Sequence, residues 1–222
     1  CTDEALQILE EVKDPTLKTD MIQKIVKYYE SVYKPEINGW ELVPPEVDDY
    51  PRAVWWNYSS VNEFSYGNPN PQIIGFLYQN KEYLEHLDID RLVDFVIDYI
   101  LNVFPKESRQ HNILSCLLFY NCLEENRQAL IRPILKQAVD KELTDNWEEY
   151  GLQPYEVALI NKDFLEGHEE LLQLNLEYCH QKLEKGLMIP NWQWYQFEAE
   201  FERAKMDWAG LLTFKAVKAL ML

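Results

Sequence analysis

Short segments that are apolar on nearly every side alternate along this chain with longer segments that are apolar on one face. Segments 72–78 (QIIGFLY) and 113–123 (ILSCLLFYNCL) belong to the first kind, and a helix that is apolar all round must be buried all round. Segments 89–103 and 125–143 follow them in turn and have the pattern of amphipathic helices. The alternation predicts two layers, in which inner helices are covered by outer helices that show one face to water.

The segment 89–103 has the clearest amphipathic pattern. Asp88 stands where an N-cap residue is expected, and Pro105 follows the last periodic residue. The two predicted faces are Ile89, Leu92, Val93, Val96, Tyr99, Ile100 and Val103 against Asp90, Arg91, Asp94 and Asp98. Earlier helices are expected at Leu6–Val12 and at Ile22–Tyr33, and Pro133 should kink the 125–143 helix or divide it in two.

Further helices continue the pattern at 154–160, 168–185 and near 198–221. The buried helices start near residues 71, 111 and 154, about 40 residues apart, which is the spacing of a helical-hairpin repeat. We therefore predict one all-α domain over residues 1–222, an α/α toroid that forms a partial or complete barrel of hairpins. An open α-solenoid is the alternative.

The stretch from Pro35 to Pro71 interrupts this rhythm with prolines, asparagines and large aromatic residues. Long loops in a compact domain are usually functional or disordered, and this aromatic content argues against disorder. We expect an ordered lid or plug over one end of the barrel. Asn70 precedes Pro71 and should cap the next helix, whose N-terminus would offer free N–H groups to a ligand.

A family resemblance rests on four stretches: ALQIL (5–9), GWELVPPEVDDYPRAVWWNY (39–58), NPNPQIIGFLYQ (68–79) and AKMDWAGLLTFKAVKAL (204–220). They resemble a group of uncharacterised bacterial proteins of the terpenoid cyclase/prenyltransferase superfamily, whose fold is an α/α toroid. The resemblance covers nearly all of the chain and implies the toroid. In that group a further N-terminal segment precedes the position of Cys1, so the chain is expected to lack it.

The catalytic signatures of that superfamily do not carry over to this chain. The group usually has His-Ala-Pro-Trp-Trp where this chain has Arg52-Ala53-Val54-Trp55-Trp56. The sequence DIDR (88–91) lacks the last Asp of the cyclase Asp-x-Asp-Asp motif, and DDYPR (48–52) is not the Asp-Asp-x-x-Asp of diphosphate-binding enzymes. The resemblance therefore implies a fold and leaves the reaction open.

The composition of the chain excludes several classes of binding partner. The formal net charge of −17 disfavours nucleic acid and anionic membrane surfaces, and no apolar run reaches the length of a membrane span. The four cysteines form no C-x-x-C pair or zinc spacing, so we expect reduced thiols in a cytoplasmic protein. No Gly-rich phosphate loop or catalytic triad pattern is present, and no cofactor is evident. Glu46, Asp48 and Asp49 could bind a divalent cation, but we interpret them as solvated surface charge and expect no metal site.

Six residues are candidates for ligand binding. Trp55, Trp56, Asn57 and Tyr58 could line an apolar or sugar-stacking pocket. Adjacent residues of an extended loop point in opposite directions, so one Trp can pack in the core while the other contacts a ligand. Asn70 is a candidate through its helix N-terminus, and His111 through its place near the start of a buried helix, with structural roles as the alternatives.

Three functional interpretations remain open. The resemblance and the aromatic loop suggest a protein that binds or transforms a hydrophobic, isoprenoid-like ligand in the barrel. Trp-lined α/α barrels also suit sugars, which predicts two carboxylates converging in the lumen. A non-catalytic scaffold with an acidic surface for a basic partner is the third. The aromatic segment PNWQWYQFE (190–198) is interpreted as a staple for the last helix.

Overall fold

Helices make up the regular structure of this protein, as the alternating pattern predicted. The computed structural model describes residues 6, 9, 11–58 and 66–222. In that part of the chain there is no β-strand, although Lys34 and Gly39 form an isolated bridge, as do Leu143 and Leu152. The α-helices are α2 (Pro15–Ser31), α3 (Asn70–Gln79), α4 (Ile89–Asn102), α5 (Phe104–Glu107), α6 (Gln110–Asn121), α7 (Glu125–Glu142), α8 (Pro154–Asn161), α9 (Glu169–Lys185) and α10 (Glu198–Ala219).

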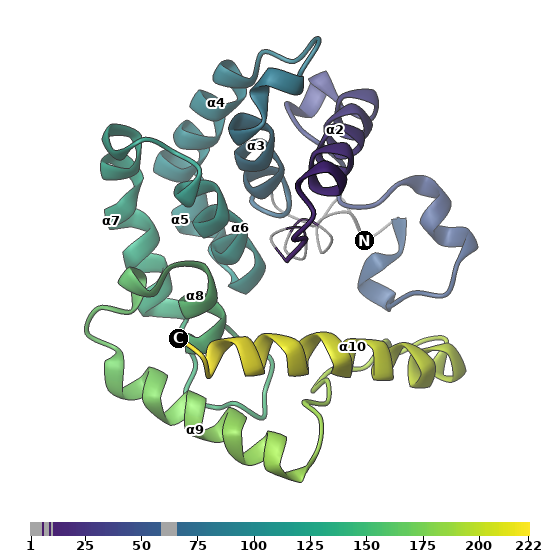
Figure 1. The fold of residues 1–222 in the computed structure, drawn as a ribbon, viewed down its shortest axis with the longest axis vertical. Coiled ribbons are helices and arrows are strands. Elements are labelled where there is room, and N and C mark those ends of the chain that lie inside the picture. The colour runs from purple at the N-terminus through teal and green to yellow at the C-terminus, as the bar shows by residue number, and fades with distance from the viewer. Residues whose placement is uncertain (1–5, 7–8, 10, 59–65) are drawn as a thin grey trace.

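The helices follow one another around an arc, and they alternate between two layers (Figure 1). In one layer α3 packs against α6, and α6 packs against α8. In the other, α4 and α7 pack against each other and cover α3 and α6. Helices α9 and α10 both pack against α8 and also contact each other, which completes the lower part of the arc in Figure 1.

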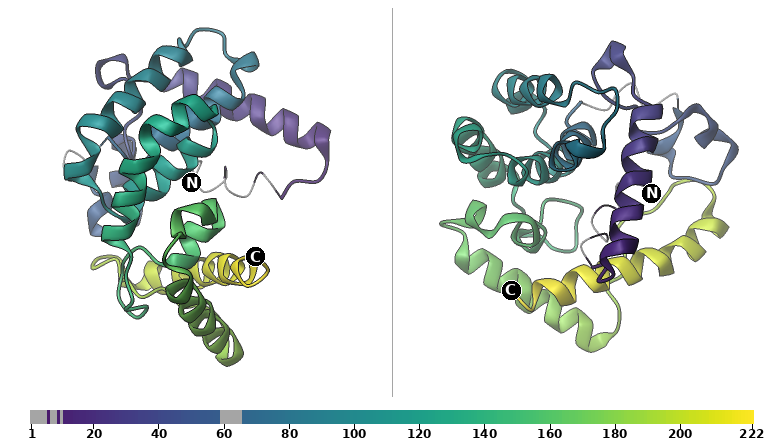
Figure 2. Two further views of the ribbon diagram at one scale, coloured as in Figure 1. Left: turned by 90° about the vertical axis from the view of Figure 1, so that its left-hand side faces the viewer. Right: turned by 45° about the horizontal axis from the view of Figure 1, so that its top comes forward.

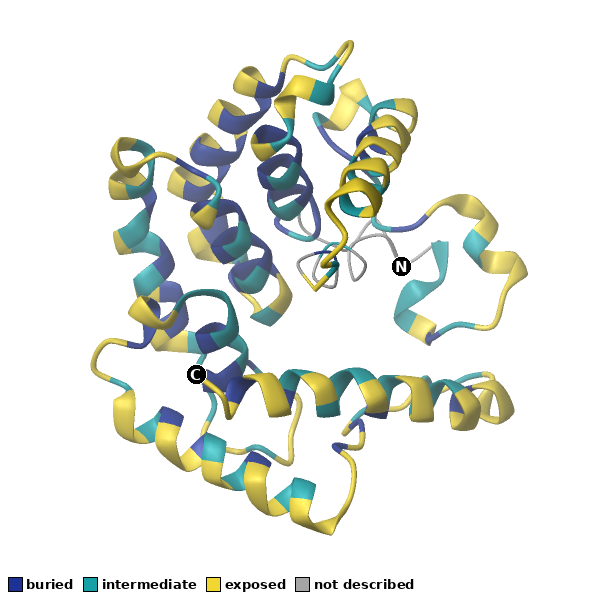
Figure 3. Cartoon of the chain, in the orientation of Figure 1, coloured by how far each residue is buried: buried dark blue, intermediate teal, exposed yellow. Residues whose placement is uncertain are grey.

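The extent to which each helix is buried depends on the layer in which it lies. Helix α3 buries seven of its ten residues and leaves Gln72 and Phe76 only partly buried, whereas α4 exposes the charged face that the sequence predicted, as the colouring of Figure 3 shows. One large core joins α3, α4, α6 and α7 through side chains such as Ile74, Val96 and Phe119. A second, smaller core joins α8, α9 and α10 through Tyr155, Cys179, Met188, Ala216 and Ala219. The candidate site described below lies beside this smaller core.

Several local expectations are confirmed and others need correction. The Asp88 carboxylate caps α4 by accepting a hydrogen bond from the Arg91 backbone N–H at 3.2 Å. Helix α2 ends at Ser31, so Tyr33 lies beyond it, and α4 ends before Pro105, which lies in α5. Pro133 lies inside a single α7, so of the two predicted outcomes, a kink or a division, the division does not occur. Of the helix expected at Leu6–Val12, Leu6 and Leu9 are helical, and several neighbouring residues lie outside the described part.

Asn70 does not cap α3, contrary to the prediction. It is the first residue of the helix, and its side chain is 4% exposed and reaches 30 residues back along the chain. The Trp40 N–H donates to Asn70 Oδ1 at 2.6 Å, and Asn70 Nδ2 donates to the Trp40 carbonyl at 3.3 Å. The helix N-terminus is satisfied instead by Ser115 of α6, whose Oγ accepts from the Gln72 N–H at 3.1 Å. The Asn70 side chain thus pairs with the buried backbone groups of Trp40 instead of capping α3, because buried backbone groups without a partner are costly.

The described part of the predicted aromatic loop is folded through three 3₁₀ turns, η1 (Pro35–Ile37), η2 (Pro45–Asp49) and η3 (Val54–Trp56). The loop is bonded to the segment before α10: the Val54 N–H donates to the Trp194 carbonyl at 3.0 Å, and Gln196 Nε2 donates to the Arg52 carbonyl at 3.0 Å. Figure 2 shows the loop next to the start of α10. Among the described residues, no helix is long and apolar enough to cross a membrane.

Candidate functional site

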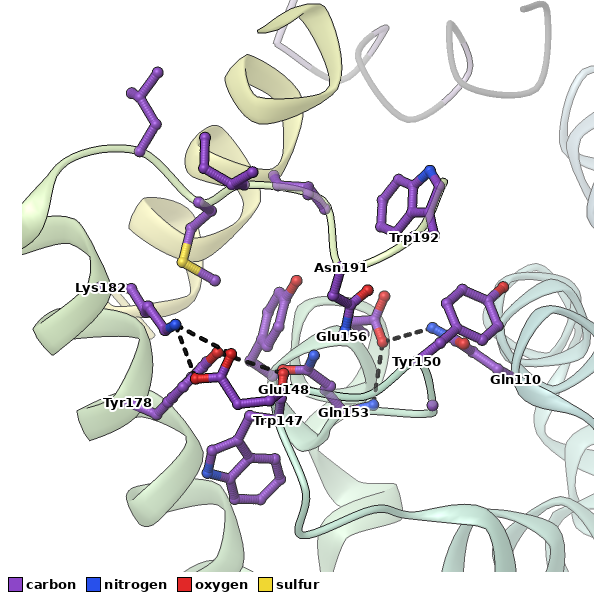
Figure 4. A pocket seen from close by; sticks show the side chains of 16 residues that line it. Gln110, Trp147, Glu148, Tyr150, Gln153, Glu156, Tyr178, Lys182, Asn191 and Trp192 are labelled. Carbon is purple, nitrogen blue, oxygen red and sulfur yellow. Dashed lines mark hydrogen bonds and ion pairs between the residues drawn. The ribbon is translucent and has the colours of Figure 1, made fainter. Parts of the chain in front are cut away.

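A cavity of about 160 Å³ lies where the first turn of α8 meets α6, α9 and α10. Two loops close it, residues 147–153 before α8 and residues 187–192 after α9. Its aromatic wall consists of Trp147, Tyr150, Tyr155, Tyr178 and Trp192, and its polar groups include Gln110, Glu148, Gln153, Glu156, Lys182 and Asn191. We call it the Glu156 cavity. Figure 4 shows Glu156 and Gln110 on one side of it, with Glu148, Tyr178 and Lys182 on the opposite side.

Glu156 is held in place by the way α8 begins. Gln153 is the N-cap, Pro154 takes the first helical position and Glu156 the third, so the two polar side chains form a capping box. The Gln153 N–H donates to Glu156 Oε2 at 3.1 Å, and Gln110 Nε2 from the start of α6 donates to the same oxygen at 3.0 Å. Both donors are neutral. The described residues give Glu156 Oε1 no hydrogen bond.

Burial dominates the protonation of Glu156. It raises the pKa of this carboxyl group, even though the Gln153 N–H, the charge of Lys215 on α10 and the Gln110 amide all act to lower it. The neighbouring Tyr150 is affected in the same direction, because burial and then the charge of Glu156 raise its pKa to about 12. Perturbed groups of this kind gather at functional sites more often than elsewhere.

Gln110 contributes a second unusual atom. Its Nε2 donates to Glu156, but its Oε1 is buried and has no hydrogen-bond partner. Buried side-chain acceptors nearly always have a partner, and leaving one without costs about 1–3 kcal/mol. The cavity therefore contains an acceptor that a bound donor would satisfy.

The opposite wall is a charged pair. Lys182 Nζ lies 2.8 Å from Glu148 Oε1, and the same ammonium lies 5.1 Å from the centre of the Tyr178 ring. The hydrogen bond from Lys182 lowers the pKa of the Glu148 carboxyl. The cavity thus has two carboxylates whose surroundings move their pKa values in opposite directions, which is the arrangement found in acid–base pairs.

The elements around the cavity are tied together by buried bonds. Asn175 of α9 is 0% exposed; its Oδ1 accepts from the Tyr155 N–H at 2.9 Å, and its Nδ2 donates to Gln153 Oε1 at 3.1 Å. The Thr144 N–H donates to the Leu152 carbonyl at 3.0 Å and so closes the loop before α8. Groups held by such second contacts stay in place when a ligand binds.

His111 is the predicted site residue that contacts the wall of this cavity, although it does not line the cavity itself. It is exposed on the first turn of α6, and its Nε2 is hydrogen-bonded to the hydroxyl of Tyr150, a wall residue. Trp192, which we interpreted as a staple, lines the cavity and also packs edge-on against Trp208 of α10, with ring centres 5.7 Å apart. Trp194 fits the staple interpretation, since it packs against Phe201 at 5.5 Å.

The other predicted residues lie elsewhere. Trp55 packs edge-on against Tyr195, with ring centres 6.1 Å apart, and Trp56 is partly buried beside it in η3. Asn57 Oδ1 accepts from Gln196 at 3.0 Å, and the Tyr58 hydroxyl donates to Glu41 at 3.1 Å. These four residues and the buried Asn70 do not line the Glu156 cavity. A ligand site at Trp55–Tyr58 stays a prediction.

Sequence reasoning missed Gln110, Gln153 and Glu156. One signal was available, because Gln153-Pro154-Tyr155-Glu156 has the spacing of a capping box with proline at the first helical position. That pattern places a carboxylate on the first turn of a helix that was predicted to be buried. In the described part of the chain, no group of three His, Cys, Asp or Glu side chains is arranged to hold a metal ion.

Comparison with known proteins adds no relative: no family model, no curated protein and no solved structure matches this chain. The resemblance to the terpenoid cyclase/prenyltransferase superfamily therefore stays a prediction. The functional argument depends on the cavity itself.

Proposed function

We propose that the Glu156 cavity binds a small hydroxylated ligand, with one monosaccharide unit as the class that fits. The observation that carries this is the lining, which combines five aromatic rings with amide and carboxylate groups in one cavity. The apolar face of a sugar ring packs against aromatic rings, and its hydroxyl groups both donate and accept hydrogen bonds. Trp192 and Tyr150 would supply the packing surface, and Gln110, Glu156 and Asn191 the polar contacts.

Size supports the same class. The cavity of about 160 Å³ is smaller than the pockets that enclose drug-sized ligands, which span roughly 300–1,000 Å³. We therefore expect the cavity to hold no more than a single sugar ring, and an oligosaccharide would have to extend out between the two loops.

An isoprenoid chain fits this cavity less well. Such a ligand has no hydrogen-bonding groups along its length, so it would cover Glu156 Oε1 and the Gln110 carbonyl without giving either a partner, at a cost for each. A scaffold with a filled core would have no reason to keep these groups in a cavity. The sugar interpretation is therefore the one we develop, as a binding function.

We also propose that the two layers belong to a partial α/α toroid, with the aromatic loop as its lid. The packing of α3 on α6 and of α6 on α8, each covered by an outer partner, supports this arrangement. So do the bonds from Val54 and Arg52 to the segment before α10, because they join early and late parts of the chain. The acidic composition favours the absence of nucleic acid among its partners.

Binding can be tested by ligand-observed NMR and by the tryptophan fluorescence of the full chain during titration with neutral monosaccharides. Trp192→Ala and Gln110→Ala should weaken binding about tenfold each, since each removes a packing surface or a hydrogen-bonding group of the cavity. Trp55→Ala is the matched control, because Trp55 lies outside the cavity lining, and it should leave the affinity unchanged. Loss of binding in Trp55→Ala with normal binding in Trp192→Ala would place the site at the aromatic loop instead.

A further inference from the structure

Two acceptor oxygens at the Glu156 cavity, Glu156 Oε1 and Gln110 Oε1, receive no hydrogen bond from the described residues. The hydrogen bonds that these residues make to Glu156 reach Oε2 and come from neutral groups, and Gln110 Oε1 is buried. A buried carboxylate needs a compensating charge or several good hydrogen bonds to offset its desolvation. Here the two hydrogen-bond donors are neutral, and together with the charge of Lys215 they do not offset the effect of burial on Glu156, so a ligand cation would complete the balance.

We propose that the ligand carries an amino group, bound as an ammonium that donates to Oε1 of Glu156 and Oε1 of Gln110. This inference rests on the proposed sugar-binding function, and together the two make an amino sugar the ligand class. An ammonium has three donors and no acceptor, which matches a site with two free acceptors. Hydrogen bonds between charged groups are also the stronger ones.

The capping role of Glu156 does not account for these features. A capping box uses one oxygen of the third residue, and glutamine serves in that position as well as glutamate. Capping therefore explains the bond between Glu156 Oε2 and the Gln153 N–H. It does not explain a partly buried carboxylate beside a cavity, the bond from Gln110 to the same oxygen, or the Gln110 carbonyl, to which no described residue donates.

The aromatic wall supports a cation as well as a sugar ring. A cation within about 6 Å of an aromatic ring centre is attracted to its face, and Tyr150, Tyr155 and Trp192 line the cavity with Glu156. Lys182 does not fill this role, because it is paired with Glu148 on the opposite wall. The overall charge of −17 also favours the approach of a cationic ligand.

Binding of the ammonium should depend on pH. It favours the ionised form of Glu156, so affinity should rise as the pH passes upward through the pKa of this group, which burial raises in the free protein. Affinity should fall again when the ligand amine loses its proton. The other titratable groups that act here are Glu148, Lys182, Lys215, Tyr150, Tyr155 and Cys179.

The test compares glucosamine, N-acetylglucosamine and glucose on the full chain by isothermal titration calorimetry and ligand-observed NMR at one pH near neutrality. Glucosamine should bind about tenfold or more tightly than glucose, since hydrogen bonds to charged groups are about twice as strong as neutral ones. N-acetylglucosamine should lose that advantage, because acetylation removes the charge. Glu156→Gln keeps the cap and should make the affinities for glucosamine and glucose equal, whereas Glu177→Gln on the exposed face of α9 should preserve the difference.

The outcomes separate the two proposals. If glucosamine and glucose bind the wild-type chain equally, the ammonium inference is overturned and the sugar site stands. If cyclohexylamine binds but no sugar does, the ammonium contact stands and the sugar-binding function is overturned. If none of these compounds binds, both proposals fail. Thermal unfolding of Glu156→Gln checks that the variant is folded, and the wild-type comparison does not depend on it.

Discussion

Gly75 and Gly210 both lie inside helices, yet replacing each by alanine should change stability in opposite directions. In α3, a Cβ built on Gly75 would lie 3.0 Å from the Phe119 Cα and 3.0 Å from the Cys122 Sγ. Phe119 is fully buried in α6, and its backbone is held by the helix, so it has little room to move. A Cβ on Gly210, in the middle of α10, would have no neighbouring atom within 4 Å.

The expected magnitudes follow from two terms. Alanine is favoured over glycine inside a helix by about 1 kcal/mol, and this gain applies at both positions. At Gly75 the overpacking of α3 against α6 costs about 1–3 kcal/mol, so the net effect is a loss of about 1 kcal/mol in the free energy of unfolding. At Gly210 there is no overpacking cost, so only the gain in helix propensity applies. The two variants should therefore differ by about 2 kcal/mol, which corresponds to roughly 4–8 °C in Tm for a chain of this size.

Urea unfolding followed by circular dichroism measures both variants against the wild type, and the m-value shows whether the unfolding remains two-state. Gly210→Ala serves as the control for helix propensity, since the substitution is chemically identical. Stabilisation of Gly75→Ala by the same amount as Gly210→Ala would refute the close contact of α3 with α6. It would also weaken the assignment of α3 to the inner layer.

Three further substitutions test other parts of the fold. Gly39→Ala should lower Tm, because an added Cβ would overlap Asn70 Oδ1, which its hydrogen bond with the Trp40 N–H holds in place; an unchanged Tm would contradict this geometry. Asn175→Ala leaves the buried Tyr155 N–H at the start of α8 without its partner and should cost about 1–3 kcal/mol in urea unfolding, whereas Gln173→Ala on the same helix, where residue 173 is exposed, should cost little. Glu30→Gln should destabilise the protein at pH 7 and less so in acid. Although burial acts to raise the pKa of Glu30, the N–H groups of residues 85–87 lower it overall, so its contribution is present above the pKa of an unfolded glutamate and is lost as the pH falls. A destabilisation that is constant with pH would contradict this assignment.

The helices were predictable because their signals are local. The apolar segments that became α3 and α6 are buried over most of their surface, because a helix with almost no polar face has to be enclosed. Each keeps one partly exposed stripe, which includes Phe76 in α3 and Leu114 in α6. The cap at Asp88 was equally local. For Pro133 the sequence allowed either a kink or a division, and α7 is a single helix that contains Pro133.

The candidate site was much less predictable. Its lining comes from residue 110 on α6, from two loops near residues 150 and 190, and from α8, α9 and α10, and no local pattern indicates which loops meet in space. Asn70 failed for a related reason, because a partner 30 residues away decided the use of its side chain. His111 was selected for a place facing a lumen and instead contacts Tyr150 at the rim of the cavity. The aromatic composition of the loop suggested a ligand site there, whereas in the structure the Trp55 ring packs on Tyr195.

The choice of glutamate at position 156 bears on whether this cavity is functional. Burial raises the pKa of Glu156, so between the pKa of an unfolded glutamate and the raised value in the fold, the unfolded chain releases its proton first. The stability contributed by this group is thus complete below the unfolded pKa and is lost as the pH rises. A glutamine would keep the capping box without that loss. A residue that lowers stability at neutral pH, when a close substitute would not, is expected where a ligand uses its charge. This reasoning favours a cationic ligand over a neutral one for the Glu156 cavity.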